Sequence, residues 1–168
     1  PSLHALLDAL AAGAVRLDDV VLVDDRRLPM TPLLGEGRSD VPEALRGRVR
    51  VLTGRGRGPA AARNVGWRAT RGEWVAFLDD DVLPPPDWYA ALLADLAGCA
   101  DDVGASQGRI EVPLPADRRP TDWERNVRGL EGARWATADM AFRRAALASS
   151  GGFDERFPRA YREDVDLG

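Results

Sequence analysis

Glu73-Trp74-Val75-Ala76-Phe77-Leu78-Asp79-Asp80-Asp81 is a short apolar run that stops in three carboxylates. Its length and its β-favouring residues predict a buried strand whose acidic end lies at the rim of a sheet. Carboxylates this close repel one another unless a cation lies among them. A divalent metal that also holds phosphate oxygens explains the cluster. The alternative is that these acids form a turn or cap the next helix, a task that Asp87 could perform alone.

The composition is that of one soluble globular domain. The chain has 168 residues, 45% of them hydrophobic and 30% charged, which suffices for a sizeable core. A net charge of -4 argues against nucleic acid as a partner, since such proteins usually carry a basic face. The single cysteine, Cys99, excludes an intramolecular disulfide. No run is long enough for a membrane span and no signal peptide is visible, so we expect a cytoplasmic protein.

A second strand also ends in acids. The β-branched run from Val20 to Val23 is followed by Asp24 and Asp25. In open α/β sheets, ligands bind outside the carboxyl ends of the strands, so two acid-ended strands would face one crevice. Turn formation is again the alternative for this pair.

Alternating strands and helices are expected along the rest of the chain. Apolar patterning and breakers predict helices over 1–13, 86–97 and 143–148, one beginning at Pro59 and one near 122–130. They predict strands over 49–52 and 135–142, and a strand or hairpin over 103–112. The turn Gly54–Gly58 before Pro59 can bring backbone N–H groups to a phosphate, but it matches neither a dinucleotide fingerprint nor a P-loop. Because the chain opens in a helix, we expect that a first strand is missing.

The motifs together resemble the family-2 glycosyltransferases with the GT-A fold. The matching segments are Val23-Asp24-Asp25, Ala62-Arg63-Asn64-Val65-Gly66, Phe77-Leu78-Asp79-Asp80-Asp81, Gly151-Gly152-Phe153-Asp154-Glu155 and Glu163-Asp164-Val165-Asp166-Leu167. Each is unspecific alone, while their order and spacing are jointly specific. The resemblance implies an α/β fold with a mostly parallel central sheet flanked by helices. It also implies that residues 1–168 are a single GT-A domain truncated at both ends.

The resemblance further implies a nucleotide-diphosphate sugar donor, Mn²⁺ or Mg²⁺, and inverting transfer to the hydroxyl of a glycan, lipid or small-molecule acceptor. It assigns nucleotide binding to Asp24, Asp25, Arg63, Asp79 and Asp80, and metal binding to Asp81 and Asp79. It makes Asp164 the general base with Glu163 as its companion, and places Asp139 on the acceptor side, where family members often have Asn. In the longer protein the domain could lie at the inner face of the membrane.

The chemistry fits these roles. A diphosphate leaving group needs a cation, and an attacking hydroxyl needs a carboxylate within hydrogen-bond reach. Two other classes stay open: a non-catalytic module that binds nucleotide sugars, and a sugar nucleotidyltransferase. The latter usually has a glycine-rich loop with a basic residue after its first strand, and production of pyrophosphate would identify it.

Overall fold

The computed structural model describes residues 2–157, so the predicted catalytic pair, Glu163 and Asp164, lies outside the described residues. The α-helices are α1 (Leu3–Ala11), α2 (Pro59–Ala69), α3 (Trp88–Gly98), α4 (Asp122–Arg128) and α5 (Arg144–Ser150). The strands are β1 (Val20–Asp24), β2 (Val49–Thr53), β3 (Trp74–Leu78), β4 (Ala105–Gln107) and β5 (Asp139–Arg143). Short 3-10 turns span Glu36–Arg38, Glu43–Leu45 and Gly129–Gly132.

Strands β1 and β2 form a parallel pair of mainly β-branched residues. The register aligns Val20 with Val49 and Asp24 with Thr53, so the acidic end of β1 lies beside the end of β2. Helix α1 packs on this pair through Leu7, which is fully buried. Leu7 belongs to a buried apolar cluster whose other members are Leu17, Leu34, Val41, Leu45 and Val49.

The other three strands form a second sheet in the order β3-β5-β4, with β5 antiparallel to both neighbours. Leu78 pairs with Asp139, which places Asp139 beside the point where the acid cluster begins. Of the strand or hairpin expected over 103–112, the structure has the short strand β4. It ends at Gln107, although Gly108 N still donates to the Asp139 carbonyl at 2.9 Å, and the Asp139 carboxylate fills the space that a side chain at Gly108 would need.

The direction of the strands follows from the contacts of α2. Its first half contacts the acidic ends of β1 and β3, and its last residues lie where β2 and β3 begin. The hydrogen bonds are Gly58 N to Asp25 (2.7 Å), Arg63 to Asp79 (3.2 Å), Arg50 to the Ala69 carbonyl (3.0 Å) and Arg144 to the Trp67 carbonyl (2.8 Å). Strands β1 to β4 therefore run in one direction and β5 runs against them. The expected α/β fold is confirmed, while of the three strand ladders within residues 2–157 only β1–β2 is parallel and both ladders of β5 are antiparallel.

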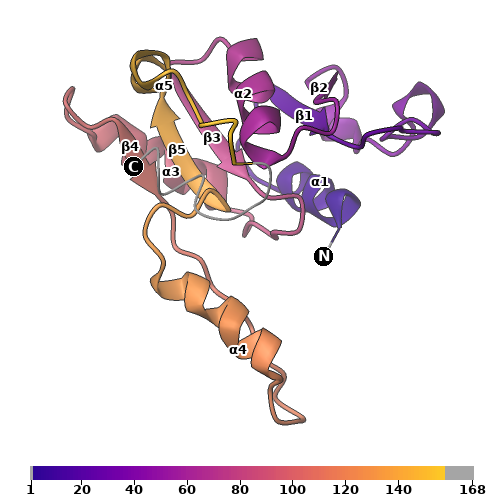
Figure 1. Ribbon diagram of the computed structural model, residues 1–168, viewed down its shortest axis with the longest axis vertical. Coiled ribbons are helices and arrows are strands. Elements are labelled where there is room, and N and C mark those ends of the chain that lie inside the picture. Colours follow the sequence, from indigo (N-terminus) through magenta and orange to yellow (C-terminus); the bar gives the residue numbers. More distant parts are fainter. Residues whose placement is uncertain (1, 158–168) are drawn as a thin grey trace.

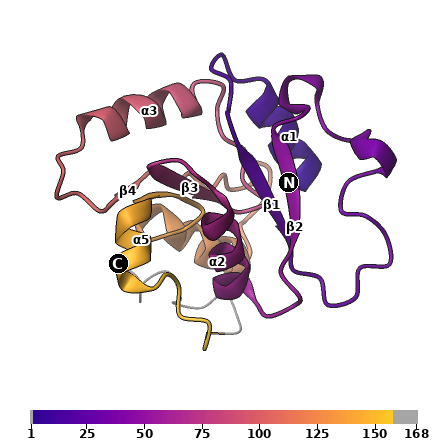
Figure 2. The same ribbon diagram turned by 90° about the horizontal axis from the view of Figure 1, so that it is seen from above.

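The elements form three layers. Figure 2 shows α1 and α3 on one side of the strands and α2 and α5 on the other. The core between the sheet and the α2–α5 side is made by Ala60, Trp67, Val75, Met140, Phe142, Leu147 and Phe153. The aromatic rings of this core meet edge to face, with 5.3 Å between the centroids of Phe77 and Phe153.

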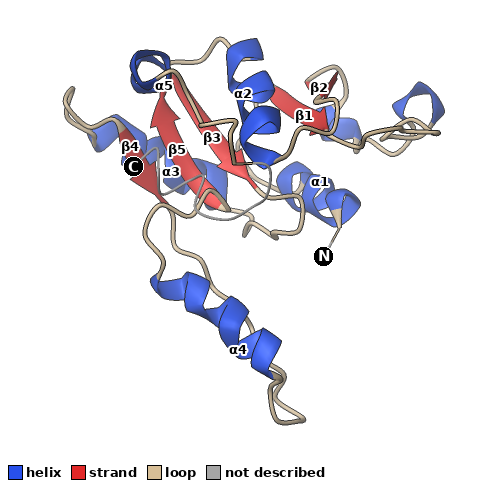
Figure 3. Ribbon diagram, viewed as in Figure 1, coloured by secondary structure: helices blue, strands red, loops and turns tan. Residues whose placement is uncertain are grey.

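Residues 108–134 form an arm that extends away from the layers (Figure 1). Most of it is loop, with α4 near its tip (Figure 3). Helix α4 begins with a capping box, in which the side chains of Thr121 and Glu124 each accept a backbone N–H of the other residue. Hydrogen bonds from Arg118 and Thr121 lower the pKa of Glu124 to about 2. The arm is thus held by local polar contacts, while Trp123 is 73% exposed.

A substitution of Leu147 on α5 tests how much the buried core beside the second sheet contributes to the stability of the protein. It is fully buried in that core, so we expect Leu147→Ala to lower the free energy of unfolding by roughly 2–5 kcal/mol, because it removes buried methyl groups and leaves a cavity. Urea denaturation followed by circular dichroism measures the change.

Leu93→Ala on α3 is the matched control. Leu93 is 43% exposed, so the same truncation there should cost less than about 1 kcal/mol. Equal losses at the two positions would contradict the assignment of the core.

Candidate active site

The carboxylate of Asp24 at the end of β1 is engaged within the chain. It is buried and accepts hydrogen bonds from Arg26 Nε at 2.8 Å and Nη2 at 2.7 Å. These bonds lower the pKa of Asp24 despite its burial. Arg26 Nη2 also donates to the Thr31 carbonyl at 2.9 Å. Asp24 therefore ties the loop after β1 to the sheet.

Asp25 binds the glycine-rich turn that precedes α2. Its carboxylate accepts the backbone N–H groups of Arg57 at 3.1 Å and Gly58 at 2.7 Å. The same carboxylate fills the space that a Cβ at Gly54 would occupy. The sequence raised the possibility that this turn presents its N–H groups to a phosphate, whereas in the structure two of them bind Asp25.

The acid cluster at the end of β3 is divided by burial. Asp79 is half-buried and accepts a hydrogen bond from Arg63 Nη2 at 3.2 Å, whereas Asp80 and Asp81 are exposed. Burial raises the pKa of Asp79; Arg63 opposes this effect, and the neighbouring charges of Asp81 and Asp80 add to it. Two carboxylates of the cluster are thus open to solvent beside a third that Arg63 partly neutralises.

One cavity of about 800 Å³ receives both acidic strand ends. Asp24, Asp25, Asp79 and Asp80 line it together with Arg26 and Arg63. Every residue of 18–26 and of 74–80 lines the cavity. Because successive side chains of a strand point to opposite faces, these unbroken runs indicate that the cavity follows the facing edges of β1 and β3. The expected convergence of the two acid-ended strands is therefore present, while Asp81 and Asp139 are not among the lining residues.

Asp139 pairs with Leu78, the residue before the acid cluster, and does not line this cavity. Trp88 Nε1 donates to its carboxylate at 3.0 Å. Burial raises the pKa of Asp139, and the bond from Trp88 opposes the shift. Sequence reasoning did not anticipate this contact, because Trp88 reads as one more apolar residue of an amphipathic helix.

The donor set suits a hard cation. Among residues 2–157 no group of three or more His, Cys, Asp and Glu side chains is arranged to hold a metal ion. Mg²⁺, however, is usually held by one or two carboxylates together with phosphate oxygens of the substrate. The exposed carboxylates next to Asp79 fit that pattern.

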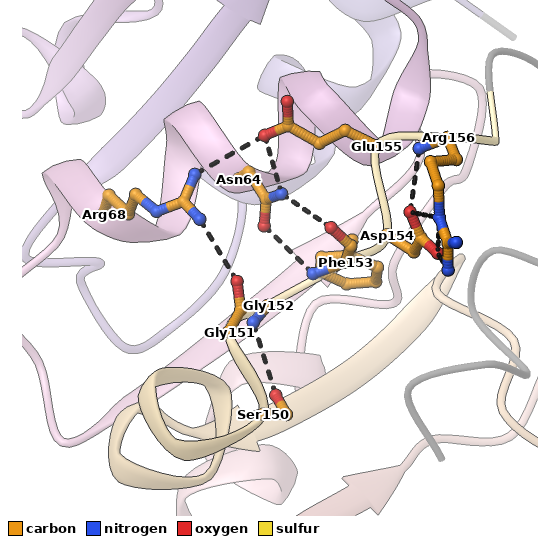
Figure 4. Close-up of a pocket in the computed structure, with 9 residues that line it drawn as sticks. All are labelled: Asn64, Arg68, Ser150, Gly151, Gly152, Phe153, Asp154, Glu155 and Arg156. Atoms are coloured by element: carbon orange, nitrogen blue, oxygen red, sulfur yellow. Dashed lines mark hydrogen bonds and ion pairs between the residues drawn. The ribbon is translucent and has the colours of Figure 1, made fainter.

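Sequence reasoning also missed Asn64. Its side chain is buried and faces the turn Gly151–Glu155, where an open polar pocket of about 460 Å³ lies (Figure 4). An asparagine in a helix of small residues reads as a solvated position, and only its burial reveals its contacts. The one available signal was its place within a motif shared with a known family.

Solved structures with a similar fold include TarS of S. aureus. Its residues 1–349 superpose with a TM-score of 0.63 and 18% identity over 98% of this chain and 50% of that one. A complex of the same protein with UDP gives a TM-score of 0.62 at 17% identity over 99% and 50%. The fold is thus that of the GT-A glycosyltransferases.

The sequence assigns the family. The model of glycosyl transferase family 2 matches residues 1–165, and the chain belongs to this family. The succinoglycan biosynthesis protein ExoO of Rhizobium meliloti is 40% identical over 98 residues, which are 56% of this chain and 26% of that protein. The pre-mycofactocin glycosyltransferase of Mycobacterium tuberculosis is 34% identical over 124 residues, 66% of this chain. The chain spans about a quarter of the length of these relatives.

Asp139→Asn tests the electrostatics of the site. A carboxyl whose folded-state pKa is raised contributes stability below its unfolded pKa and loses it as pH rises through the folded pKa. Asn can still accept the Trp88 bond and carries no charge. We therefore expect the melting temperature of Asp139→Asn, relative to the unsubstituted protein, to rise between pH 3.5 and pH 7.

Thermal unfolding at several pH values measures this difference. Asp117→Asn on the exposed arm is the control and should show no such trend. A relative melting temperature that falls toward neutral pH would show that Asp139 is stabilised as an anion.

Proposed function

We propose that the protein transfers a sugar, with inversion, from a nucleotide-diphosphate donor to an acceptor hydroxyl. The observation that carries the proposal is the meeting of two acidic strand ends at one cavity in a chain of the family-2 glycosyltransferases. No helix within residues 2–157 has the length and apolar character to cross a bilayer. The cytoplasmic location expected from the sequence stays a prediction.

We assign different roles to the charged groups that line the cavity. Asp24 and Asp25 lie at the end of β1, where their carboxylates shape the loops that would enclose a nucleoside. Arg63 lies between α2 and Asp79 and brings positive charge to the side where a diphosphate would lie. Asp80 lines the same cavity and is exposed.

Asp81 and Asp79 are the residues that we propose to hold Mn²⁺ or Mg²⁺. When bound, such a cation neutralises the charge that develops on the departing diphosphate. The raised pKa of Asp79 accords with this role, because a carboxyl that is costly to ionise alone gains most from a cation. Binding of the cation and of nucleotide should therefore depend on each other.

Uridine diphosphate is the first donor nucleotide to test. Structures of the similar TarS protein were determined with UDP and with UDP-GlcNAc. Low identity limits that similarity to the fold, so it suggests a probe and assigns neither base nor sugar. The acceptor remains one of the three classes expected from the sequence.

Asp81→Ala tests the metal assignment. We expect it to weaken Mn²⁺-dependent binding of UDP by tenfold or more, about 1.4 kcal/mol, because the cation loses a carboxylate ligand. Isothermal titration calorimetry with and without EDTA measures the change. Asp117→Ala on the arm is the control, and an unchanged affinity in Asp81→Ala would remove Asp81 from the site.

Asp164→Asn tests the proposed base. In the whole natural protein we expect the variant to lower kcat roughly 100- to 10,000-fold while UDP binding is kept, since an amide cannot accept the hydroxyl proton. Turnover near the unsubstituted level would exclude Asp164 as the base. Binding without transfer in the unsubstituted protein would favour a non-catalytic binding module.

A further inference from the structure

The amide of Asn64 uses every hydrogen bond that it can make. The side chain is 1% exposed, and a buried amide is costly unless its donors and acceptors are paired. Nδ2 donates to the Phe153 carbonyl at 2.8 Å and to Glu155 Oε1 at 2.9 Å. Oδ1 accepts from Phe153 N at 3.0 Å and from Trp67 Nε1 at 2.9 Å. The amide thus pairs with both main-chain groups of Phe153, as Figure 4 shows.

The turn that Asn64 holds is shaped to receive it. Gly151 and Gly152 have φ values of 84° and 83°, which favour glycine. A Cβ at Gly152 would lie 2.8 Å from Trp67 Nε1 and would overlap Asn64 Oδ1. Arg68, one helical turn after Asn64, donates to the Gly151 carbonyl at 3.2 Å. Helix α2 therefore holds the turn 151–155 by several polar contacts, with Asn64 at the buried centre.

The turn reaches the acidic end of β3 through Phe153. The Phe153 ring packs edge to face against Phe77, two residues before Asp79. The Arg63 guanidinium lies 5.7 Å from the centroid of the Phe153 ring and donates to Asp79 at 3.2 Å. A shift of Phe153 would move the surface on which the Arg63–Asp79 pair rests.

The same turn reaches the acidic end of β1 through Glu155. One oxygen of Glu155 accepts from Asn64, and the other pairs with the Arg57 guanidinium. The backbone N–H of Arg57 donates to Asp25 at 3.1 Å. The path from Asn64 to Asp25 therefore runs through two side chains that are themselves ion-paired.

From these contacts we infer that Asn64 is a positioning residue of the nucleotide-sugar site, which sets the turn 151–155 and through it both acidic strand ends. The inference rests on the proposed function for the role of the site, while the anchoring can be measured without nucleotide. Asn64 touches neither Asp25 nor Asp79, so it acts through Phe153 and Glu155.

The experiment compares Asn64→Ala with Leu7→Ala. Leu7 is fully buried in the cluster around α1, so its truncation destabilises the protein without touching the turn. Hydrogen exchange of the Phe153 and Gly58 amides, the ring resonances of Phe77 and the Kd for UDP with Mn²⁺ are measured where circular dichroism shows both variants folded.

For Asn64→Ala we expect exchange at Phe153 to rise at least tenfold, exchange at Gly58 to rise, the Phe77 resonances to shift and the Kd to increase at least tenfold. Leu7→Ala should leave all four readouts near those of the unsubstituted protein. A folded Asn64→Ala that keeps its protection at Phe153, or that changes neither Gly58 nor Phe77, overturns the inference.

The two proposals fail separately. If Asn64→Ala moves the resonances but changes the Kd less than twofold, the positioning role is wrong and the proposed function stands. If the unsubstituted protein binds no UDP or other nucleoside diphosphate while the resonances still move, the proposed function is wrong and the anchoring stands.

A second variant decides the matter should Asn64→Ala not fold. Glu155→Gln keeps an acceptor for Asn64 and removes the charge that pairs with Arg57. We expect it to speed exchange at Gly58 and to leave the Phe77 resonances unchanged. No change at Gly58 overturns the path to Asp25.

Discussion

Helix α2 is bonded to the acidic ends of two strands that belong to separate sheets, and the arrangement of the site depends on this attachment. The amide at its start binds Asp25, and Arg63 in its second turn binds Asp79. These two bonds hold the ends of β1 and β3 against the same half of α2, in agreement with the two strands running in the same direction. Their carboxylates then open into one cavity.

The carboxylates at this site differ in their burial and in their hydrogen-bond partners. Asp24 accepts two hydrogen bonds from the Arg26 guanidinium and one from its backbone N–H, and Asp25 accepts two backbone N–H groups, so both carboxylates hold loops. Asp79 is half-buried with one arginine partner, while Asp80 and Asp81 are exposed. Exposed negative charge is therefore concentrated at the end of β3, which is where a cation would be most strongly attracted.

Much of this architecture could be predicted from local sequence. The run Val20–Val23 and the run Trp74–Leu78 became β1 and β3 with nearly the expected bounds, because apolar runs that stop at acids and glycines leave little choice of element. The strand or hairpin expected over 103–112 was too long, because only Ala105–Gln107 is a strand. Local patterning did not show that the carboxylate of Asp139, 31 residues along the chain, fills the space beside Gly108, where no side chain would fit.

The sequence by itself determined which segments are strands and helices and that acids stand at two strand ends, because these features depend on neighbouring residues. Only the tertiary structure decided which acids are bound by arginine or backbone amides, that Trp88 bonds Asp139, and that Asn64 is buried against Phe153. These contacts join residues up to 98 positions apart. Burial and hydrogen-bond partners at such separations depend on how whole helices and strands pack together. Patterns of neighbouring residues do not predict that packing.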